Sequence, residues 1–395
     1  MTVAFESTRF DSTAFTRWCG EALYNRVIRQ GAELLERACD LQLTHLYRQL
    51  DFGGLLAEPR TAHEISQALG FEASAWLALE AMLGRLAERT GVVASRNGAS
   101  APQFRAVAEP ADPAPEFALV RRAMAELGPG YSAALEFLDF GCAKFVTALR
   151  DDLEFMDRVL SGRDPEQCAL WFRATNADPM QDLHGRMGAR AVADLFGGGA
   201  VLEIGGGTGN GIRHLFGELA ARDALDRVQH YLFTDVSPRF ILDTRREIRE
   251  TYPGVPCDWR YLDINRPFAA QNVKPEGVDL IYAVNAAHVA KDLVGALREC
   301  YKALRPGGRV VFAERVRKHA GDMAPRELTL NLSRYHRTAA IRNPVYRPAH
   351  AYLVASHWPI VFEQAGFRAP ELHPDLAVTR GAFPAHYAAV VTAVR

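Results

Sequence analysis

The segment VLEIGGGTGNG, residues 201–211, has the pattern of a loop that lies against a small ligand. An apolar run ends at an acidic residue, and several glycines follow before the first apolar residues of a helix. Glycine lets the backbone turn sharply here and lets a ligand approach with no Cβ in between. The spacing is GxGxG directly after the acid, unlike the GxGxxG of dinucleotide-binding loops. The residues that we expect on this side of a cofactor site are Glu203, Gly205, Gly206, Gly207 and Gly209.

Two more acidic residues stand at the ends of the next apolar runs. HYLFTD ends in Asp235, and RYLDIN contains Asp263. The first carboxylate can accept hydrogen bonds from both hydroxyls of a ribose, and the second can accept one from the amino group of an adenine. A dinucleotide site would instead aim a helix N-terminus at a pyrophosphate. The three acids therefore predict an adenosyl ligand without phosphates. We also expect Ile264, which follows Asp263, and Asn285, which follows the run VDLIYAV, in its site.

A histidine and a glutamate follow two later apolar runs. His288 comes just after VDLIYAV, and Glu314 ends RVVFAE. Histidine suits a general base because its pKa lies near neutral pH, and a carboxylate beside it fixes its tautomer and stabilises the imidazolium. We therefore predict that His288 and Glu314 form a catalytic dyad. The alternative is that His288 is structural and that Glu314 pairs with Arg315 or Arg317.

The elements that must position these residues alternate between strands and helices. The runs AVLEI, HYLFTD, VDLIYAV and RVVFAE are each followed by a helical or polar stretch. This order predicts an α/β fold with a doubly wound, mostly parallel, Rossmann-like sheet covered on both faces. The ligand site of such a sheet lies at the carboxyl ends of its strands, where the residues above are expected.

The N-terminal half is mainly helical instead. ELLERACDLQLTHLYRQL has the apolar spacing of an amphipathic helix, and Thr61 with Glu64 predicts a capping box. Gly70 is placed to end that helix, and a second helix and a short strand follow. This is the order of a winged helix. We expect three domains: residues 1–115, winged-helix-like; residues 116–198, a helical connector and lid; and residues 199–395, the cofactor-binding catalytic domain.

Charge argues against a nucleic-acid partner. Lys plus Arg number 46 and Asp plus Glu number 47, which gives a net charge of −1. In the helix expected over residues 73–89, Arg85 and Arg89 are offset by Glu80 and Glu88. Because contacts to phosphates dominate affinity for nucleic acids, a neutral helix is a poor reader of DNA. We expect a role in dimerisation or as a lid over the substrate.

Composition indicates a globular protein of a reducing compartment. Hydrophobic residues make up 48% and charged residues 24% of the chain, close to the average of globular domains. The six cysteines form no CxxC pair, so neither a zinc knuckle nor a dense disulfide framework is expected. The start, MTVAFESTRF, has no signal-peptide pattern, and no apolar run approaches the ~18 residues of a membrane span. We expect a cytoplasmic protein with no membrane partner.

Residues 199–316, including LRPGGRVVFAE, resemble the class I S-adenosylmethionine-dependent methyltransferases. The N-terminal half resembles, more loosely, the winged-helix domain of small-molecule O-methyltransferases. The resemblance implies S-adenosyl-L-methionine as cofactor and a homodimer. It also implies that Glu203 and the glycine loop flank the methionine moiety, with Asp235 at the ribose and Asp263 near the adenine.

The run from Asn285 to His288, with Glu314 at the end of the next strand, resembles the C-methyltransferases of polyketide synthases. In that family the pair acts on a β-ketoacyl thioester. The O-methyltransferases usually read His-Asp-Trp at this histidine, where this chain has Val289 and Ala290. Other relatives methylate C3 of 2-oxo acids with the help of a metal. His336 would be the second ligand here, but no HxH or HxxE pairing supports a metal site, and we predict none.

The segment from residue 315 to 350 has a local excess of Lys and Arg and carries three further histidines. Arginine binds planar carboxylates and phosphates through two hydrogen bonds, so the excess favours an anionic acceptor, either a free 2-oxo acid or the phosphopantetheine arm of a carrier protein. A solvated helix face explains the charges equally well. We predict that Tyr335, His336 and Arg337 bind the substrate.

Three functions remain open at this point. The first is methylation of an acidic carbon next to a carbonyl group, with His288 as the base. The second is methylation of a small-molecule hydroxyl or carboxyl group by the same base. The third is a transcription regulator that senses the cofactor.

Overall fold

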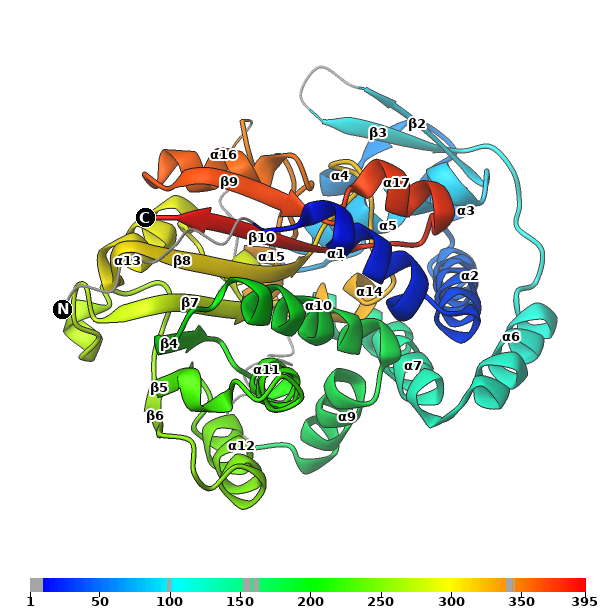
Figure 1. Cartoon of the computed structure of the whole chain (residues 1–395). Helices are drawn as coiled ribbons and strands as arrows, with labels where there is room; N and C mark the ends of the chain where they lie inside the picture. The colour runs from blue at the N-terminus through cyan, green and yellow to red at the C-terminus, as the bar shows by residue number, and fades with distance from the viewer. Residues whose placement is uncertain (1–9, 98–100, 152–157, 159–162, 339–342, 344) are drawn as a thin grey trace.

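The computed structural model describes residues 10–97, 101–151, 158, 163–338, 343 and 345–395 (Figure 1). Its centre is a seven-stranded sheet in the order β6-β5-β4-β7-β8-β10-β9. β10 runs antiparallel to both of its neighbours, and the other neighbouring pairs are parallel. The strands are β4 (Gly199–Ile204), β5 (Val228–Asp235), β6 (Cys257–Tyr261), β7 (Val278–Val284), β8 (Leu304–Arg315), β9 (Arg368–His373) and β10 (Ala388–Val394).

The predicted doubly wound, mostly parallel sheet is confirmed. The four apolar runs of the sequence are β4, β5, β7 and β8. From β4 the chain passes through β5 to β6, and it then returns to the other side of β4 as β7. The direction of winding therefore reverses at β4 and β7, and a ligand site is expected at their carboxyl ends.

Helices cover both faces of the sheet because alternate side chains of a strand point to opposite sides. On β4, Val201 packs in one apolar cluster with α10 and α11, and Leu202 packs in another with α13 and α16. The helices of this part are α10 (Pro179–Leu195), α11 (Asn210–Ala220), α12 (Pro238–Thr251), α13 (Leu293–Ala303), α16 (His357–Gln364) and α17 (Leu376–Ala382), with short 3-10 turns η2 (Leu225–Arg227), η3 (Ala269–Gln271) and η4 (Ala287–Val289).

The N-terminal half is mainly helical, as predicted. Its helices are α1 (Ser12–Trp18), the π-helix η1 (Cys19–Leu23), α2 (Arg26–Gln49), α3 (Phe52–Leu55), α4 (Ala62–Ala68), α5 (Trp76–Arg89), α6 (Ala114–Leu127), α7 (Pro129–Asp151) and α9 (Pro165–Asn176). None of the helices within the described residues has both the length and the apolar character to cross a membrane.

A small three-stranded sheet accompanies α4 and α5. It consists of β1 (Arg60–Thr61), β3 (Pro102–Ala106) and β2 (Val93–Asn97), in that order. Thr61 and Glu64 form the predicted capping box at the start of α4, and Gly70 follows this helix with φ +65°. The elements thus occur in the order expected of a winged helix.

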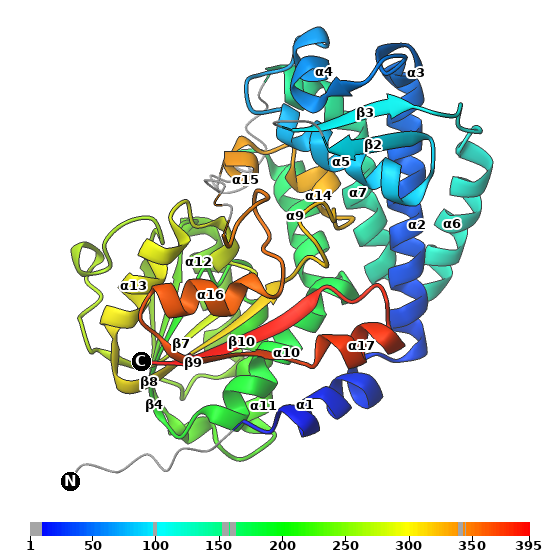
Figure 2. The same ribbon diagram turned by 90° about the horizontal axis from the view of Figure 1, so that it is seen from above.

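Packing crosses both of the predicted domain boundaries (Figure 2). At one end, α1 lies beside β9, and Ser12 Oγ is 2.9 Å from His373 Nδ1. At the other, the segment after β8 reaches the N-terminal helices through α14 (Glu327–Leu330) and α15 (Arg334–Thr338). The hydroxyl of Thr329 donates to the carbonyl of Phe137 in α7. The N-terminal and catalytic parts therefore share contacts along much of the chain.

Arg85 is buried at this junction and is not available to phosphates. Its exposed fraction is 2%, and Nη2 lies 2.8 Å from Glu36 Oε2 while Nε lies 2.8 Å from Asp40 Oδ1. Nη1 donates to the carbonyl of Met323, from the segment after β8. One of the two arginines considered for DNA contact therefore joins the N-terminal helices to the catalytic part.

We predict that Arg85→Ala lowers the free energy of unfolding by about 3–5 kcal/mol, because it leaves Glu36 and Asp40 buried without their main partner. Arg121→Ala is the matched control, since Arg121 pairs with Asp139 at the surface with half of its side chain exposed. That change should cost ~1 kcal/mol or less. Urea unfolding followed by circular dichroism measures both, and equal costs would contradict a joining role for Arg85.

Candidate active site

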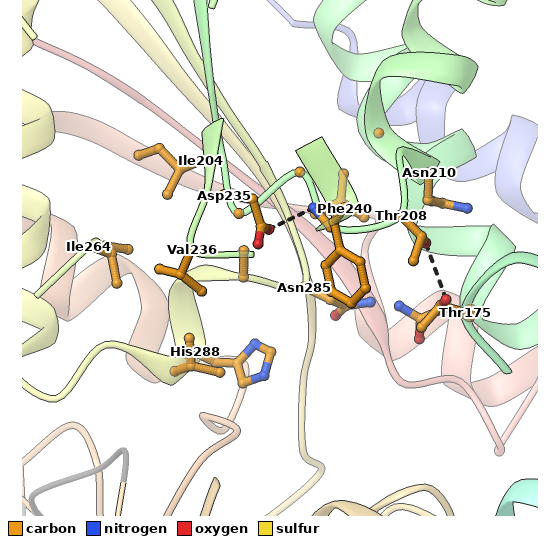
Figure 3. Close-up of a pocket in the computed structure, with 18 of the residues that line it drawn as sticks. Thr175, Ile204, Thr208, Asn210, Asp235, Val236, Phe240, Ile264, Asn285 and His288 are labelled. Atoms are coloured by element: carbon orange, nitrogen blue, oxygen red, sulfur yellow. Dashed lines mark hydrogen bonds between the residues drawn. The ribbon is translucent and has the colours of Figure 1, made fainter. Parts of the chain in front are cut away.

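A cavity of about 200 Å³ lies at the carboxyl ends of the central strands. It is lined by residues from the loop after β4, from the ends of β5 and β7, and from helices of the preceding segment. Figure 3 shows the apolar side chains Ile204, Val236 and Ile264 on one side of it. On the other side lie Thr175, Thr208 and Asn210. This is the location that the sheet topology predicts for a ligand.

The glycine loop has no room for side chains. Gly205 has φ +61°, and a Cβ there would come within 2.6 Å of the Cβ of Ala286. A Cβ on Gly206 would clash with the ring of Phe233. Gly205, Gly206 and Gly207 line the cavity, whereas Gly209 caps the start of α11 with φ +85° and is not among the lining residues. The loop thus presents bare backbone to the cavity.

Asp235, at the end of β5, lines the cavity and is tied to the glycine loop. Its Oδ2 accepts a hydrogen bond from the backbone N–H of Gly207 at 2.8 Å (Figure 3). Its Oδ1 accepts one from the backbone N–H of Ser237 at 2.7 Å. Burial raises the pKa of this carboxyl, and the backbone donors oppose that rise. Asp235 therefore holds the loop in shape at the edge of the cavity.

Two predicted cofactor residues lie behind the surface of the cavity. Asp263 is not among the lining residues, although its neighbours Leu262 and Ile264 are, and its Oδ1 accepts a hydrogen bond from the backbone N–H of Asn265. Glu203 is fully buried, and the hydroxyl of Tyr231 donates to its Oε2 at 2.8 Å. Burial raises the pKa of Glu203 to about 8. Its carboxyl lies behind the glycine loop and is not among the residues that line the cavity.

His288 and Glu314 meet in a buried pair beside the cavity. His288 lies on η4, just after β7, and its Nδ1 is 2.7 Å from Oε2 of Glu314 at the end of β8. Oε1 of the same carboxylate accepts hydrogen bonds from the backbone N–H groups of Ala286, at 3.1 Å, and Ala287, at 2.7 Å. His288 lines the cavity and Glu314 is fully buried behind it. The alternative pairing of Glu314 with Arg315 or Arg317 is not found in the described part.

Because a carboxylate can only accept, we assign the proton to Nδ1 of His288, which leaves Nε2 with a free lone pair. Asn285 directly follows β7 and lies in the same turn, with φ +49°. Its Oδ1 accepts from the backbone N–H of Arg315 at 2.8 Å, and its buried Nδ2 has no hydrogen-bond partner among the described residues. The turn after β7 therefore brings a base and a free amide donor to one cavity.

Arg347 holds this turn through hydrogen bonds to backbone carbonyls. Its Nη1 donates to the carbonyl of Ala290 at 2.9 Å, and Nη2 donates to the carbonyls of His288 and Ala351. Burial lowers the pKa of Arg347 to about 10. These hydrogen bonds join the histidine turn to the segment that carries Tyr352.

Aromatic rings surround the imidazole of His288. The ring of Tyr352 lies 4.3 Å from it and that of His336 lies 6.2 Å from it, measured between centroids, and both residues line the cavity. Burial raises the pKa of Tyr352 to about 12. Burial also lowers the pKa of His336 well below its usual value, and its Nε2 has no hydrogen-bond partner in the described part. Both groups are therefore neutral near pH 7.

The structure separates the three predicted substrate residues. His336 lines the cavity, but Arg337 does not, because its Nη2 lies 2.6 Å from Glu72 and its Nη1 donates to the carbonyl of Asn331. The side chain of Tyr335 lies outside the described part of the chain. Other cations of the basic segment are also paired inside the fold: Arg317 with Glu327, and Arg326 with Asp178.

Several lining residues were not predicted. Trp171 and Thr175 come from α9, Gln181 from α10 and Phe240 from α12. Thr175 Oγ1 lies 3.1 Å from Oγ1 of Thr208 in the glycine loop (Figure 3). Trp171 and Thr175 are four residues apart, so they share a helix face, but that spacing alone does not separate a cavity wall from a core. Within the described residues, no group of three or more His, Cys, Asp or Glu side chains could hold a metal ion.

Solved structures of methyltransferases share the fold of nearly the whole chain. The CurJ carbon methyltransferase matches with a TM-score of 0.76 and 18% identity, over 98% of this chain and 99% of its own. The CMeT domain of the citrinin polyketide synthase matches with a TM-score of 0.68 and 16% identity, over 98% and 97%. The trans-methyltransferase CalH, solved with SAH, matches with a TM-score of 0.57 and 18% identity, over 92% and 90%.

A family described as a methyltransferase domain matches residues 202–310, from β4 into β8. These residues are a class I methyltransferase domain. The match includes the glycine loop, Asp235 and His288. The predicted enzyme class is confirmed, and so is S-adenosylmethionine as the cofactor of this methyltransferase domain.

Two curated relatives match less than a third of this chain. A highly reducing polyketide synthase of Pyrenophora dematioidea is 30% identical over 114 residues, which is 29% of this chain and 4% of that protein. The polyketide synthase ThaG of Burkholderia thailandensis is 36% identical over 114 residues, which is 29% of this chain and 2% of that protein. The chain thus matches only a small part of the length of these relatives.

The cavity fits S-adenosylmethionine. Gly205, Gly206 and Gly207 line it with bare backbone that a ligand can approach closely. Side chains at Gly205 or Gly206 would instead collide with Ala286 or Phe233 and displace the loop. The apolar wall of Ile204, Val236 and Ile264 suits a flat aromatic base, and the free Nδ2 of Asn285 can donate to a polar group.

We predict that Gly206→Ala weakens the binding of S-adenosylhomocysteine at least tenfold, because the new Cβ displaces either the loop or the ring of Phe233. Gly217→Ala is the control, since a Cβ at that position in α11 meets only the hydroxyl of Tyr252, at 3.8 Å. It should change the affinity less than twofold. Titration calorimetry measures both, and unchanged binding by Gly206→Ala would place the cofactor elsewhere.

Proposed function

We propose that this methyltransferase domain transfers a methyl group to an acidic carbon next to a carbonyl group, in a β-ketoacyl thioester or a 2-oxo acid. The observation that carries the proposal is the buried pair of His288 and Glu314 at the wall of the cavity. A base held in this way can remove a proton from carbon, which is the step that carbon methylation needs before transfer.

In this proposal the residues around the glycine loop hold the cofactor. Gly205, Gly206 and Gly207 take the amino-acid end, Asp235 takes the ribose hydroxyls, and Ile264 lies against the adenine. Asp263, Asn285 and the buried Glu203 complete the site as supporting residues, with Gly209 at the helix start. S-adenosylmethionine supplies an electrophilic methyl group on a sulfonium.

His288 is the proposed general base. Nδ1 donates to Glu314, so Nε2 is free to accept the α-proton of the acceptor. The electron pair of the broken C–H bond then forms the carbon–carbon double bond of an enolate, and its negative charge moves to the carbonyl oxygen. Glu314 stabilises the imidazolium that results, as a carboxylate does in other His–acid pairs.

The comparisons favour carbon over oxygen as the site of methylation. Of the structures with the same fold, CurJ is described as a carbon methyltransferase and the citrinin structure as a CMeT domain of a polyketide synthase. The curated relatives are polyketide synthases. An O-methyltransferase with the same base stays the alternative, because a phenol or enol would be deprotonated in the same way. The burial of Arg85 disfavours the regulator.

We propose that the acceptor is a small molecule or a carrier-bound group, and that His336 and Tyr352 form part of the wall of its site. An anionic acceptor stays part of the proposal, although Arg337 and Arg317 are paired within the fold. A homodimer, a cytoplasmic location and the absence of a nucleic-acid partner also stay predictions.

Exchange of α-protons with D₂O tests the proposal. With S-adenosylhomocysteine in the cofactor site, we expect the protein to catalyse exchange in the thioester of acetoacetate with N-acetylcysteamine or in 2-oxobutanoate, as followed by mass spectrometry. EDTA should not slow it if the His–Glu pair acts without a metal. No exchange in either compound would move the assignment to O-methylation.

We predict that His288→Ala slows this exchange by about 10²–10⁴-fold, because the general base is lost. Glu314→Gln should slow it less, since Nδ1 keeps a hydrogen-bond acceptor without the charge. His230→Ala is the control, because His230 pairs with Asp258 at the surface, far from the cavity lining. An unchanged rate in His288→Ala would exclude this base.

A further inference from the structure

Arg326 is a buried arginine inside the candidate active site. Its exposed fraction is 4%, and among the described residues it is the only Lys or Arg that lines the cavity with His288. It precedes α14, in the segment that leads from β8 to Tyr352. The mechanism above does not use it.

The guanidinium of Arg326 is held by hydrogen bonds at one of its nitrogens, Nη1. Nη1 donates to the carbonyl of Ala174 at 2.7 Å and to Oδ2 of Asp178 at 2.9 Å, and the guanidinium lies 4.7 Å from the centre of the Phe137 ring. Asp178 is itself fully buried and accepts from the backbone N–H of Met180 through its other oxygen. These contacts position the guanidinium and still leave Nε and Nη2 without a hydrogen bond in the described part of the chain.

Nε and Nη2 of Arg326 are not fully buried, unlike several other arginine donors of this segment, and the residue lines the cavity. A charged donor that faces a cavity can form a strong hydrogen bond with a ligand that accepts from it. Burial lowers the pKa of Arg326, and Asp178 opposes that effect. Nε of Arg315, of Arg317 and of Arg347 is buried without a hydrogen-bond partner in the described part of the chain, but none of these three residues lines this cavity. Arg326 is therefore the cation whose free donors a bound acceptor can reach.

We propose that Arg326 is the oxyanion-binding residue of this site, which donates to the acceptor oxygen that becomes negative when His288 removes the α-proton. The inference rests on the proposed carbon-acid chemistry and names the group that stabilises its intermediate. The α-C–H bond breaks, its proton goes to Nε2 of His288, and its electron pair forms the enolate double bond. The carbonyl oxygen takes the negative charge and accepts from Arg326.

The charges of the site favour this role. His336 and Tyr352 are neutral, so they offer hydrogen bonds without a positive charge, whereas Arg326 offers both. A charge-assisted hydrogen bond is about twice as strong as a neutral one. A guanidinium and a sulfonium in one cavity also repel each other, and the negative charge of an enolate relieves that repulsion.

The test is the exchange of α-protons in D₂O with S-adenosylhomocysteine bound and the N-acetylcysteamine thioester of acetoacetate as acceptor. Loss of one oxyanion donor costs about 10²–10³-fold in rate, so Arg326→Met should slow exchange by that factor. Arg326→Lys keeps the charge and should recover part of the rate. The affinity for S-adenosylhomocysteine should stay within about threefold in both variants.

Controls separate this role from a structural one. Arg317→Met removes an equally buried arginine that is paired with Glu327 and does not line the cavity, and it should change the exchange rate less than threefold in folded protein. Because Arg326→Met leaves Asp178 unpaired, Arg326→Met with Asp178→Asn removes both charges and should be just as slow.

The outcomes that would overturn the inference are distinct. Wild-type exchange that needs His288 but is unchanged in Arg326→Met would leave the proposed function standing and exclude Arg326 as the oxyanion-binding residue. A loss of S-adenosylhomocysteine affinity would assign the guanidinium to the carboxylate of the cofactor instead. No exchange in the wild type would contradict the proposed function itself.

Discussion

The site depends on one buried carboxylate. Glu314 has no exposed surface, and a charge in such a position is stable only when its oxygens are satisfied by donors. Three donors meet it: Nδ1 of His288 and the backbone N–H groups of Ala286 and Ala287. Because β7 and β8 are neighbours in the sheet, the end of one strand can hold the turn that follows the other. The same interaction therefore shapes the turn and orients the imidazole.

In the basic segment, residues 315–350, burial decides which cations are available to a ligand. In sequence its arginines suggested an anionic ligand. In the structure Arg317 and Arg337 are paired with carboxylates, and Arg347 holds three backbone carbonyls. Arg337 joins this segment to the loop between α4 and α5, Arg347 joins it to the turn after β7, and Arg317 pairs within the segment itself. Arg326 differs because it lines the cavity as well.

Much of the sheet and of its central site could be predicted because the signals are local. The glycine loop and Asp235 sit at strand ends, and their positions follow from the order of strands. The sequence could not show that Asp235 lines the cavity while Glu203 lies behind the loop, because this depends on the direction of each side chain. Trp171 and Arg326 could not be predicted as lining residues either. The helix α9 and the irregular segment after β8 reach the cavity only through tertiary packing.

The central claim is that Glu314 keeps the proton of neutral His288 on Nδ1 and leaves Nε2 as the base. The nitrogen chemical shifts of ¹⁵N-labelled His288, measured by NMR with S-adenosylhomocysteine bound, report this tautomer directly. The account predicts a protonated Nδ1 and an unprotonated Nε2 in the neutral ring, with the preference weakened in Glu314→Gln. A neutral ring with its proton on Nε2, or a tautomer that Glu314→Gln leaves unchanged, would contradict it.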